Sequence, residues 1–329
     1  MLYVLAALAL VILILLPLTS LDQLQALNLP FVMDRYLFRI ATLVLMFVII
    51  ASAWNIIGGL TGYPAFGNVV FFGIGAYAVG TLMTKANLPF FAALAGAVVV
   101  AAAAAALIGL PLLRLRGHYF AVASLGVAVA TGEVITHLPP ELFGGAAGIF
   151  LPIVRSDLLF YYLMLGGAAA TVVITWLVLR TRFGFGLIAI REDETAAAVI
   201  GVNTTLYKVA AYMLSAALTA FAGGVYAQWN VFIDQSTAFN LDVSIDSILM
   251  VLIGGIGTVF GPVLGALVLE YLIQTFAGSG DVAVLTQVAL GVVLTVAVIF
   301  LPRGVVDFFG GRSSLSLRYL RRTLRENGV

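Results

Sequence analysis

Long apolar runs separated by short polar stretches set the pattern of this chain. A helix needs about 20 apolar residues to cross a hydrocarbon core of about 30 Å. The pattern therefore predicts an all-α integral membrane protein with about ten transmembrane helices, at residues 2–19, 39–60, 64–84, 90–113, 117–137, 158–180, 208–229, 243–258, 259–276 and 283–301. Residues 243–276 leave two arrangements open, either two full spans or one span and a re-entrant half.

Composition agrees with a membrane protein and narrows the chemistry. Hydrophobic residues make up 63% of the chain and charged residues 9%, against roughly 45–50% and 25% in soluble domains. The chain has no cysteine, no phosphate-binding P-loop motif and no His pair with metal-ligand spacing. We therefore expect neither an enzyme nor a resident metal or cofactor, and no nucleic-acid partner. A passage through the membrane is the function class that remains.

The chain divides into three parts. Residues 1–38 are expected to form an N-terminal helix and a polar linker. The helix lacks the basic start and the small-residue cleavage site of a signal peptide, so we expect it to be a retained helix. Residues 39–301 form the transmembrane domain. Residues 302–329 form a basic tail that either lies on an anionic leaflet or only sets the topology.

Lys and Arg predict the orientation, because they favour the cytoplasmic side. If the polar loop 181–207 is cytoplasmic, ten alternating spans place both termini inside. The basic residues then assigned to the cytoplasm are Arg114, Arg116, Arg180, Arg182, Arg191, Lys208, Arg303, Arg312, Arg318, Arg321, Arg322 and Arg325, and those assigned outside are Arg35, Arg39, Lys85 and Arg155.

The long polar segment Arg180–Lys208 has a helix pattern at its centre. Arg191 and the acids Glu192, Asp193 and Glu194 open the helix, where acids suit the positive end of its dipole. Gly201, followed by Asn203, supplies the stop. Such a helix is suited to contact a partner outside the membrane, although a loop that is merely helical would show the same pattern.

Two glycine-rich segments, Asn55–Gly75 and Ile253–Gly265, break the helix pattern inside the membrane. Irregular backbone at that depth must be buried in protein or face water. We expect these breaks to line a pathway, through Gly58, Gly59, Thr61, Gly62, Gly254 and Gly255, whereas the four-residue spacing of Gly257, Gly261 and Gly265 favours close helix packing. The shared I-G-G opening raises the hypothesis of an inverted repeat of two five-helix halves.

Few ionisable residues fall inside the predicted spans. Glu133 lies near the outer end of its span and shares a helix face with His137, and Glu270 lies in the outer half of another span. A charge facing lipid is costly, so each should face protein or water, or be protonated. Glu133 is therefore a candidate pathway residue, with snorkelling at the membrane interface as the alternative. Asp246 is expected to be solvated.

Four runs of sequence, in this order along the chain, resemble the LivM-like permease subunits of branched-chain amino acid ABC importers. They are Trp54–Gly80 (WNIIGGLTGYPAFGNVVFFGIGAYAVG), Leu115–Ile135 (LRGHYFAVASLGVAVATGEVI), Ile190–Ala227 (beginning IREDETAAAVIGVNTTLYK) and Asp246–Ala266 (DSILMVLIGGIGTVFGPVLGA). Together the four runs cover most of residues 54–300.

The resemblance implies a permease of the bacterial cytoplasmic membrane that pairs with a LivH-like second permease. It also implies two cytoplasmic ATPase subunits, which bind ATP and Mg²⁺, and a periplasmic substrate-binding protein. Arg191–Gly201 would be the coupling helix. Its contact residues would be Arg191, Glu192, Asp193, Glu194, Ala196, Ala197 and Gly201. The wider permease pattern E-A-A-x-x-x-G is shifted here, because Glu194 stands one place early, which puts in doubt which acid contacts the ATPase.

The implied mechanism is alternating access, with branched-chain amino acids moving inward. Three other interpretations stay open. A permease for urea or short amides would look similar, an ion-coupled secondary transporter would also show ten spans and broken helices, and a channel would give passive flux from this chain alone.

Overall fold

The structure, a computed structural model, describes residues 13, 35–154, 156–277 and 291. Predicted spans 2–19 and 283–301 and the tail 302–329 fall almost entirely outside the described residues. The helices are α3 (Arg35–Trp54), the π-helix η2 (Asn55–Leu60), α4 (Val69–Thr84), α5 (Phe90–Leu112), α6 (Gly117–His137), α7 (Pro140–Phe143), the 3-10 helix η3 (Gly145–Ala147), α8 (Asp157–Arg180), α9 (Arg182–Glu192), α10 (Glu194–Val199), α11 (Thr204–Asn230), α12 (Gln235–Ala238), α13 (Leu241–Gly254) and α14 (Gly261–Ala277). Two short strands, β1 (Ile149–Phe150) and β2 (Phe232–Ile233), pair antiparallel.

Eight apolar helices of the described region match predicted spans. Six are long enough to cross a membrane: Tyr36–Leu60, Phe90–Leu112, Gly117–His137, Asp157–Arg180, Thr204–Asn230 and Gln235–Gly254. Val69–Thr84 and Gly261–Gln274 are shorter apolar helices. Residues 243–276 form two separate helices, α13 and α14, that pack against each other. Because α14 is one of the shorter apolar helices, both predicted arrangements, two full spans or one span and a re-entrant half, stay open.

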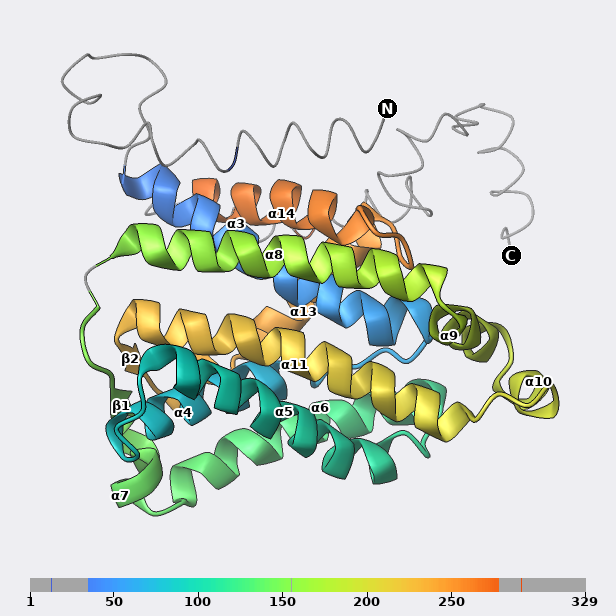
Figure 1. The fold of residues 1–329 in the computed structure, drawn as a ribbon, viewed down its shortest axis with the longest axis horizontal. Coiled ribbons are helices and arrows are strands. Elements are labelled where there is room, and N and C mark those ends of the chain that lie inside the picture. The colour runs from blue at the N-terminus through green and yellow to red at the C-terminus, as the bar shows by residue number, and fades with distance from the viewer. Residues whose placement is uncertain (1–12, 14–34, 155, 278–290, 292–329) are drawn as a thin grey trace, which may run out of the picture.

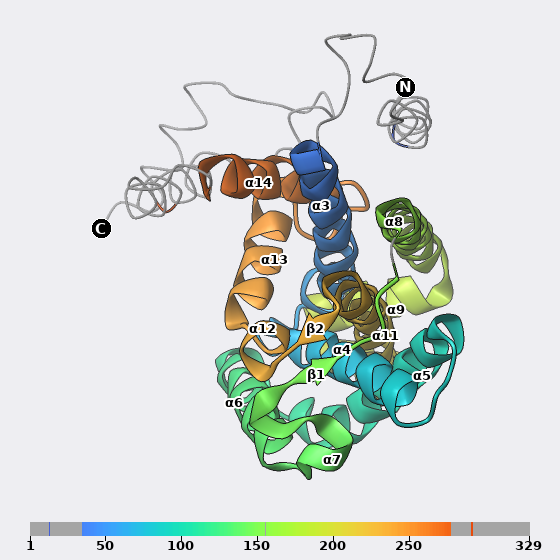
Figure 2. The same cartoon turned by 90° about the vertical axis from the view of Figure 1, so that its left-hand side faces the viewer.

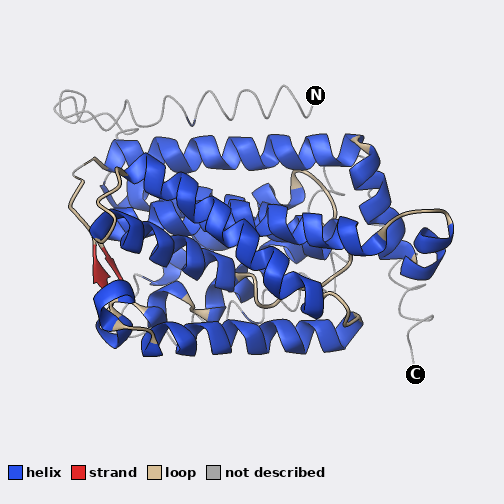
Figure 3. Cartoon of the chain, turned by 60° about the horizontal axis from the view of Figure 1, so that its bottom comes forward, coloured by secondary structure: helices blue, strands red, loops and turns tan. Residues whose placement is uncertain are grey.

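The helices run side by side between two distinct ends (Figure 1). One end carries α9 and α10, and the other carries α7 and the β1–β2 pair (Figures 1 and 3). Viewed along the bundle, α4 lies between α5 and α6, while α14 lies beside α3 and α13 (Figure 2).

Helix α11 forms the centre of the bundle and contacts α3, α4, α5 and α8. Helices α11 and α4 approach closely because a glycine of each helix faces the main chain of the other. A Cβ on Gly75 would overlap the main chain of Ala220, and a Cβ on Gly223 would overlap the main chain of Phe72. Small residues at such contacts let membrane helices approach closely, since lipid supplies no hydrophobic force to drive them together.

Both predicted helix breaks are present, but they are shorter than predicted. The first runs through the π-helix η2 and the non-helical residues 61–68, and the second comprises residues 255–260. Residues 69–75 and 261–265 are regular helix, which corrects the predicted limits. Each break lies between two apolar helices. The inverted repeat stays a prediction.

Side-chain hydroxyls satisfy the main chain where the first break meets α4. The Phe66 N–H donates to Ser124 Oγ at 3.0 Å, and the Val69 N–H donates to Ser244 Oγ at 2.9 Å. The Asn68 side chain donates to Thr219 Oγ1 at 3.0 Å. Lipid offers no hydrogen-bond partners to main-chain N–H groups. These side chains supply the partners instead, so the irregular backbone is stable only where protein surrounds it.

Candidate functional site

The polar segment folds as two helices instead of the single predicted one. Helix α9 ends at Glu192, and Asp193 is the N-cap of α10, with its Oδ1 accepting from the N–H groups of Thr195 (2.7 Å) and Ala196 (3.0 Å). These bonds hold the pKa of the Asp193 carboxyl below its usual value. Arg191 and Glu192 therefore close one helix, and only Glu194 lies in the first turn of the next.

Gly201 ends α10 as predicted, but Asn203 does not take part in that stop. Gly201 adopts a φ of +91°, a left-handed conformation that favours glycine. Asn203 belongs to the next element, because its Oδ1 accepts from the Leu206 N–H at 3.1 Å and caps α11. The two-helix segment therefore ends at a glycine turn, and a side-chain cap then starts the next helix.

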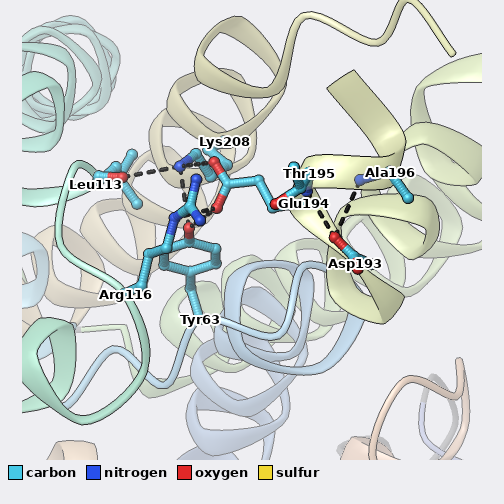
Figure 4. A network of polar contacts seen from close by, with 8 residues as sticks. All are labelled: Tyr63, Leu113, Arg116, Asp193, Glu194, Thr195, Ala196 and Lys208. Carbon is cyan, nitrogen blue, oxygen red and sulfur yellow. Dashed lines mark hydrogen bonds and ion pairs between the residues drawn. The ribbon is translucent and has the colours of Figure 1, made fainter. Parts of the chain in front are cut away.

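Three side chains from different parts of the chain converge on Glu194 (Figure 4). The Lys208 ammonium lies 2.6 Å from Glu194 Oε1, the Tyr63 hydroxyl donates to Oε2 at 2.6 Å, and Arg116 Nε lies 3.1 Å from Oε2. Lys208 also donates to the Tyr63 hydroxyl at 3.0 Å and to the Leu113 carbonyl at 2.8 Å. We call Tyr63, Arg116, Glu194 and Lys208 the Glu194 network.

The Glu194 network is a largely buried ion pair with complete hydrogen bonding. Lys208 is 4% exposed, and the Glu194 side chain is 13% exposed. Burial alone would raise the pKa of the Glu194 carboxyl, but hydrogen bonds from Lys208 and Tyr63 and the positive charges of Lys208 and Arg116 outweigh it, so that pKa is lowered. Burial and the bond to Glu194 raise the pKa of Tyr63. The network joins α10 to α11, to the α5–α6 connection and to the first helix break.

The predicted contact residues of this segment divide between two faces. Glu194 and Ala197 point into the chain, and Ala197 is 2% exposed. Glu192, Asp193, Ala196 and Gly201 are exposed. Val199 and Ile200, which sequence analysis did not single out, are 83% and 75% exposed at the end of α10.

The two helix breaks meet inside this one chain, through the amide of buried Asn55. Its Nδ2 donates to the Thr258 carbonyl at 2.9 Å, and its Oδ1 accepts from the Gly257 N–H at 2.8 Å. Arg191 Nη1 donates to the Gly59 carbonyl at 3.0 Å, so α9 reaches the same place. Arg191 therefore bonds the first break while the residue as a whole stays exposed, and its contact with a partner stays a prediction.

The predicted glycines have different surroundings. Gly254, Gly261 and Gly265 lie at the contact of α13 with α14, where a Cβ would overlap the facing backbone. Gly257 does not share that helix face, because it lies in the break with a φ of +73°, and this corrects its assignment to packing. Gly58 packs against the Trp54 ring.

The remaining predicted pathway residues belong to the breaks themselves. Thr61 is buried, and its hydroxyl donates to the Ile56 carbonyl at 3.0 Å. Gly255 has a φ of +129° directly after α13.

The acidic residues that were predicted to lie in or near the spans have different surroundings. Glu133 is exposed on α6, and the His137 ring contacts its main-chain carbonyl at 2.9 Å instead of its carboxylate. Glu270 is 1% exposed, with the Gln274 amide donating to its Oε1 at 2.7 Å. Asp246, which was expected to be solvated, is half-buried.

Sequence reasoning did not predict the Glu194 network or the role of Asn55. Lys208 is one of only two lysines in the chain, and it directly precedes a long apolar run. A lysine drawn into the start of a span requires a partner. That signal pointed to a buried pair, but it did not identify Glu194 as the partner.

Comparison with known proteins agrees with the four-run resemblance. Residues 36–301 match the family described as the branched-chain amino acid transport system permease component. The chain is 30% identical to the high-affinity branched-chain amino acid transport system permease protein LivM of Salmonella typhimurium LT2 and to LivM of Escherichia coli K12, covering 84% of this chain and 71% of each relative. It is 32% identical to the inner membrane ABC transporter permease protein YjfF of Escherichia coli K12 over 44% of this chain and 45% of that protein. No solved structure gives a significant match. The chain therefore belongs to the family of branched-chain amino acid transport permease components.

Proposed function

We propose that this chain is one permease subunit of an ABC importer that moves branched-chain amino acids inward across a bacterial cytoplasmic membrane. Its partners are a second, LivH-like permease, two cytoplasmic ATPase subunits that bind ATP and Mg²⁺, and a periplasmic substrate-binding protein. The cycle is alternating access driven by the ATPases. Family membership supports the substrate class and the subunit type.

The shape of α10 is the observation that carries the coupling role. It projects from one end of the bundle (Figure 1), outside the candidate spans, and its last residues Val199 and Ile200 are apolar and exposed. Exposed apolar side chains in water favour a protein contact. Thr195, Ala196 and Ala198 add a small, exposed surface beside them. We assign the contact with the ATPase to this surface, and an internal role to Glu194.

The orientation follows from the basic residues at the α10 end of the bundle. Arg116, Arg182 and Lys208 all lie there, beside the ends of α5, α8 and α11. Positive charge favours the cytoplasmic side. We therefore place α9 and α10 in the cytoplasm and the β1–β2 pair outside, in agreement with the predicted inside position of both termini.

The exposed face of α6 is the surface we assign to the second permease. Glu133 lies on this face within a candidate span, next to the small residues Gly126 and Ala130. A carboxylate facing lipid would be costly, whereas a protein neighbour or a water-lined path could accommodate it. The translocation path then runs between α6 and the partner permease. Because the chain lacks cysteine, Ala130→Cys provides a unique site for cross-linking to that partner.

Co-purification with the ATPase subunits tests the coupling role. Val199→Asp should remove the ATPases from the purified complex, because it places a charge in an apolar contact. Phe150→Asp is the matched control: Phe150 is 74% exposed, also lies outside the spans, and is at the opposite end of the bundle. Retention of the ATPases by Val199→Asp would refute the assigned surface.

Uptake of labelled leucine into proteoliposomes separates the rival classes. An ABC importer requires ATP and the binding protein, so omitting either should abolish uptake. Uptake that persists without ATP and collapses with an ion gradient would identify a secondary transporter. Rapid passive flux from this chain alone would identify a channel, and uptake of urea in preference to leucine would change the substrate class.

A further inference from the structure

Three glycines of the two helix breaks form a seat for one side chain, Arg191. A Cβ on Gly62 would lie 2.8 Å from Arg191 Cγ, and a Cβ on Gly257 would lie 2.8 Å from Arg191 Nη1. The third glycine, Gly59, supplies the carbonyl that accepts from Nη1 at 3.0 Å. Gly62 and Gly257 have positive φ values of +77° and +73°. The glycines therefore provide both the turn conformation and the space that the guanidinium occupies.

The seat lies where the two breaks are already joined. Asn55 bonds the second break at Gly257 and Thr258, and a Cβ on Gly59 would overlap the Asn55 side chain. The first break, the second break and α9 thus meet within one layer of contacts. Asn55 therefore couples the first break to Gly257 and Thr258, about 200 positions further along the chain, as long as its two hydrogen bonds persist.

Arg191 comes from the segment that we assign to the ATPase contact. It lies two residues before the Asp193 N-cap of α10, and its Nη2 contacts Glu192 Oε1 at 3.1 Å. Its side chain is 35% exposed, so one edge of the guanidinium faces outward while the other bonds the break. Glu194 also ties α10 to the first break, through Tyr63, but Arg191 is the side chain that reaches both breaks.

We infer that Arg191 is a positioning residue that transmits displacement of α10 to the junction of the two helix breaks. This inference rests on the proposed function, because it presumes that an ATPase moves α10. The Arg191 guanidinium can hold the Gly59 carbonyl in a defined geometry, because its donors lie in one rigid plane. When Arg191 moves, the Gly59 carbonyl and the backbone at Gly257 must follow it or lose their contacts.

The test uses the complete complex in proteoliposomes and measures ATP hydrolysis and leucine uptake together. Arg191→Ala should lower uptake per ATP hydrolysed by about 5- to 150-fold, the usual range for coupling between two sites. Hydrolysis and co-purification of the ATPases should stay near the wild-type level. Arg182→Ala, on the same helix and exposed, should leave uptake per ATP unchanged. Arg191→Lys, which keeps one charged donor, should restore part of the coupling.

A thiol-labelling measurement reports the junction directly. Ile256 is 46% exposed in the second break, and the chain has no native cysteine, so Ile256→Cys carries a unique thiol. Its labelling rate should change when ATP is added to the wild-type background, and this change should be absent with Arg191→Ala. If Arg191→Ala does not insert, Arg191→Gln carries the test, since its amide is too short to span the seat.

The outcomes are distinct. Wild-type coupling and wild-type labelling changes in Arg191→Ala, or in Arg191→Gln where that variant is used, would overturn the inference. Loss of the ATPases from the Arg191→Ala complex would also overturn it, because Arg191 would then be a docking residue, while the proposed function would survive. Failure of the unmutated complex to couple uptake to ATP would overturn both.

Discussion

The Lys208 ammonium donates to three acceptors within the chain, at Glu194, Tyr63 and Leu113, and it is 4% exposed. Glu194→Gln removes its counter-ion and leaves a buried cation bonded to neutral groups, which costs about 3–5 kcal/mol. Lys208→Met has a smaller effect, about 1–3 kcal/mol. Glu194 Oε1, the Tyr63 hydroxyl and the Leu113 carbonyl each lose one donor, but the carboxylate charge keeps Tyr63 and Arg116 as partners through Oε2. We therefore predict unequal effects from the two halves of one ion pair.

Thermal unfolding of the purified complex in detergent measures this difference. At about 2 °C per kcal/mol, the lower end of the range for larger domains, Glu194→Gln should lower the melting temperature by about 6–10 °C and Lys208→Met by about 2–6 °C. The double variant should be more stable than Glu194→Gln alone, since it contains no unpaired buried charge. Equal single effects, or a double variant whose loss is the sum of both, would refute the buried-pair reasoning.

Three further predictions concern acid and glycine. The lowered pKa of Glu194 means that its stabilising contribution is present above its unfolded pKa of about 4.3 and is lost as the pH falls through the folded value. The wild-type melting temperature should therefore fall more steeply below about pH 4 than that of Glu194→Gln, and parallel curves would contradict this. Gly201→Ala should cost about 1–2 kcal/mol by conformational strain alone, because its φ is +91° and its surroundings are open, whereas Gly166→Ala in open space on α8 should cost nothing in the same thermal assay. Gly75→Ala should cost about 1–3 kcal/mol by forcing α4 away from α11, and the same Gly166→Ala control, which has open space on α8, should not.

The apolar pattern predicted the described helices well because lipid leaves few alternatives. A span must be long, apolar and internally hydrogen-bonded, and each of these properties can be read locally. Glycine-rich sequence likewise indicated both breaks. The exact limits were missed, because whether Gly75 or Gly265 continues a helix depends on the facing backbone of a distant helix.

The sequence located the candidate site along the chain, but it did not show which of its side chains bond to the rest of the protein. Local spacing located Arg191–Gly201 and its glycine stop. It could not show that Asp193 separates two helices, that Arg191 bonds the first break, or that Glu194 points inward, because their partners Gly59, Lys208 and Tyr63 lie on other elements. Charged residues in a polar loop look like contact residues until the rest of the fold is known.

The Asn55 junction has a consequence for how the protein is made. Its two partners lie 202 and 203 positions further along the chain, so the ribosome completes most of the protein before either can bond. Until then the amide of Asn55 has no partner at the junction, in a segment that lipid cannot solvate. We expect the nascent N-terminal half to remain beside the insertion machinery until Gly257 and Thr258 arrive, and chains truncated before residue 255 to be degraded by membrane proteases.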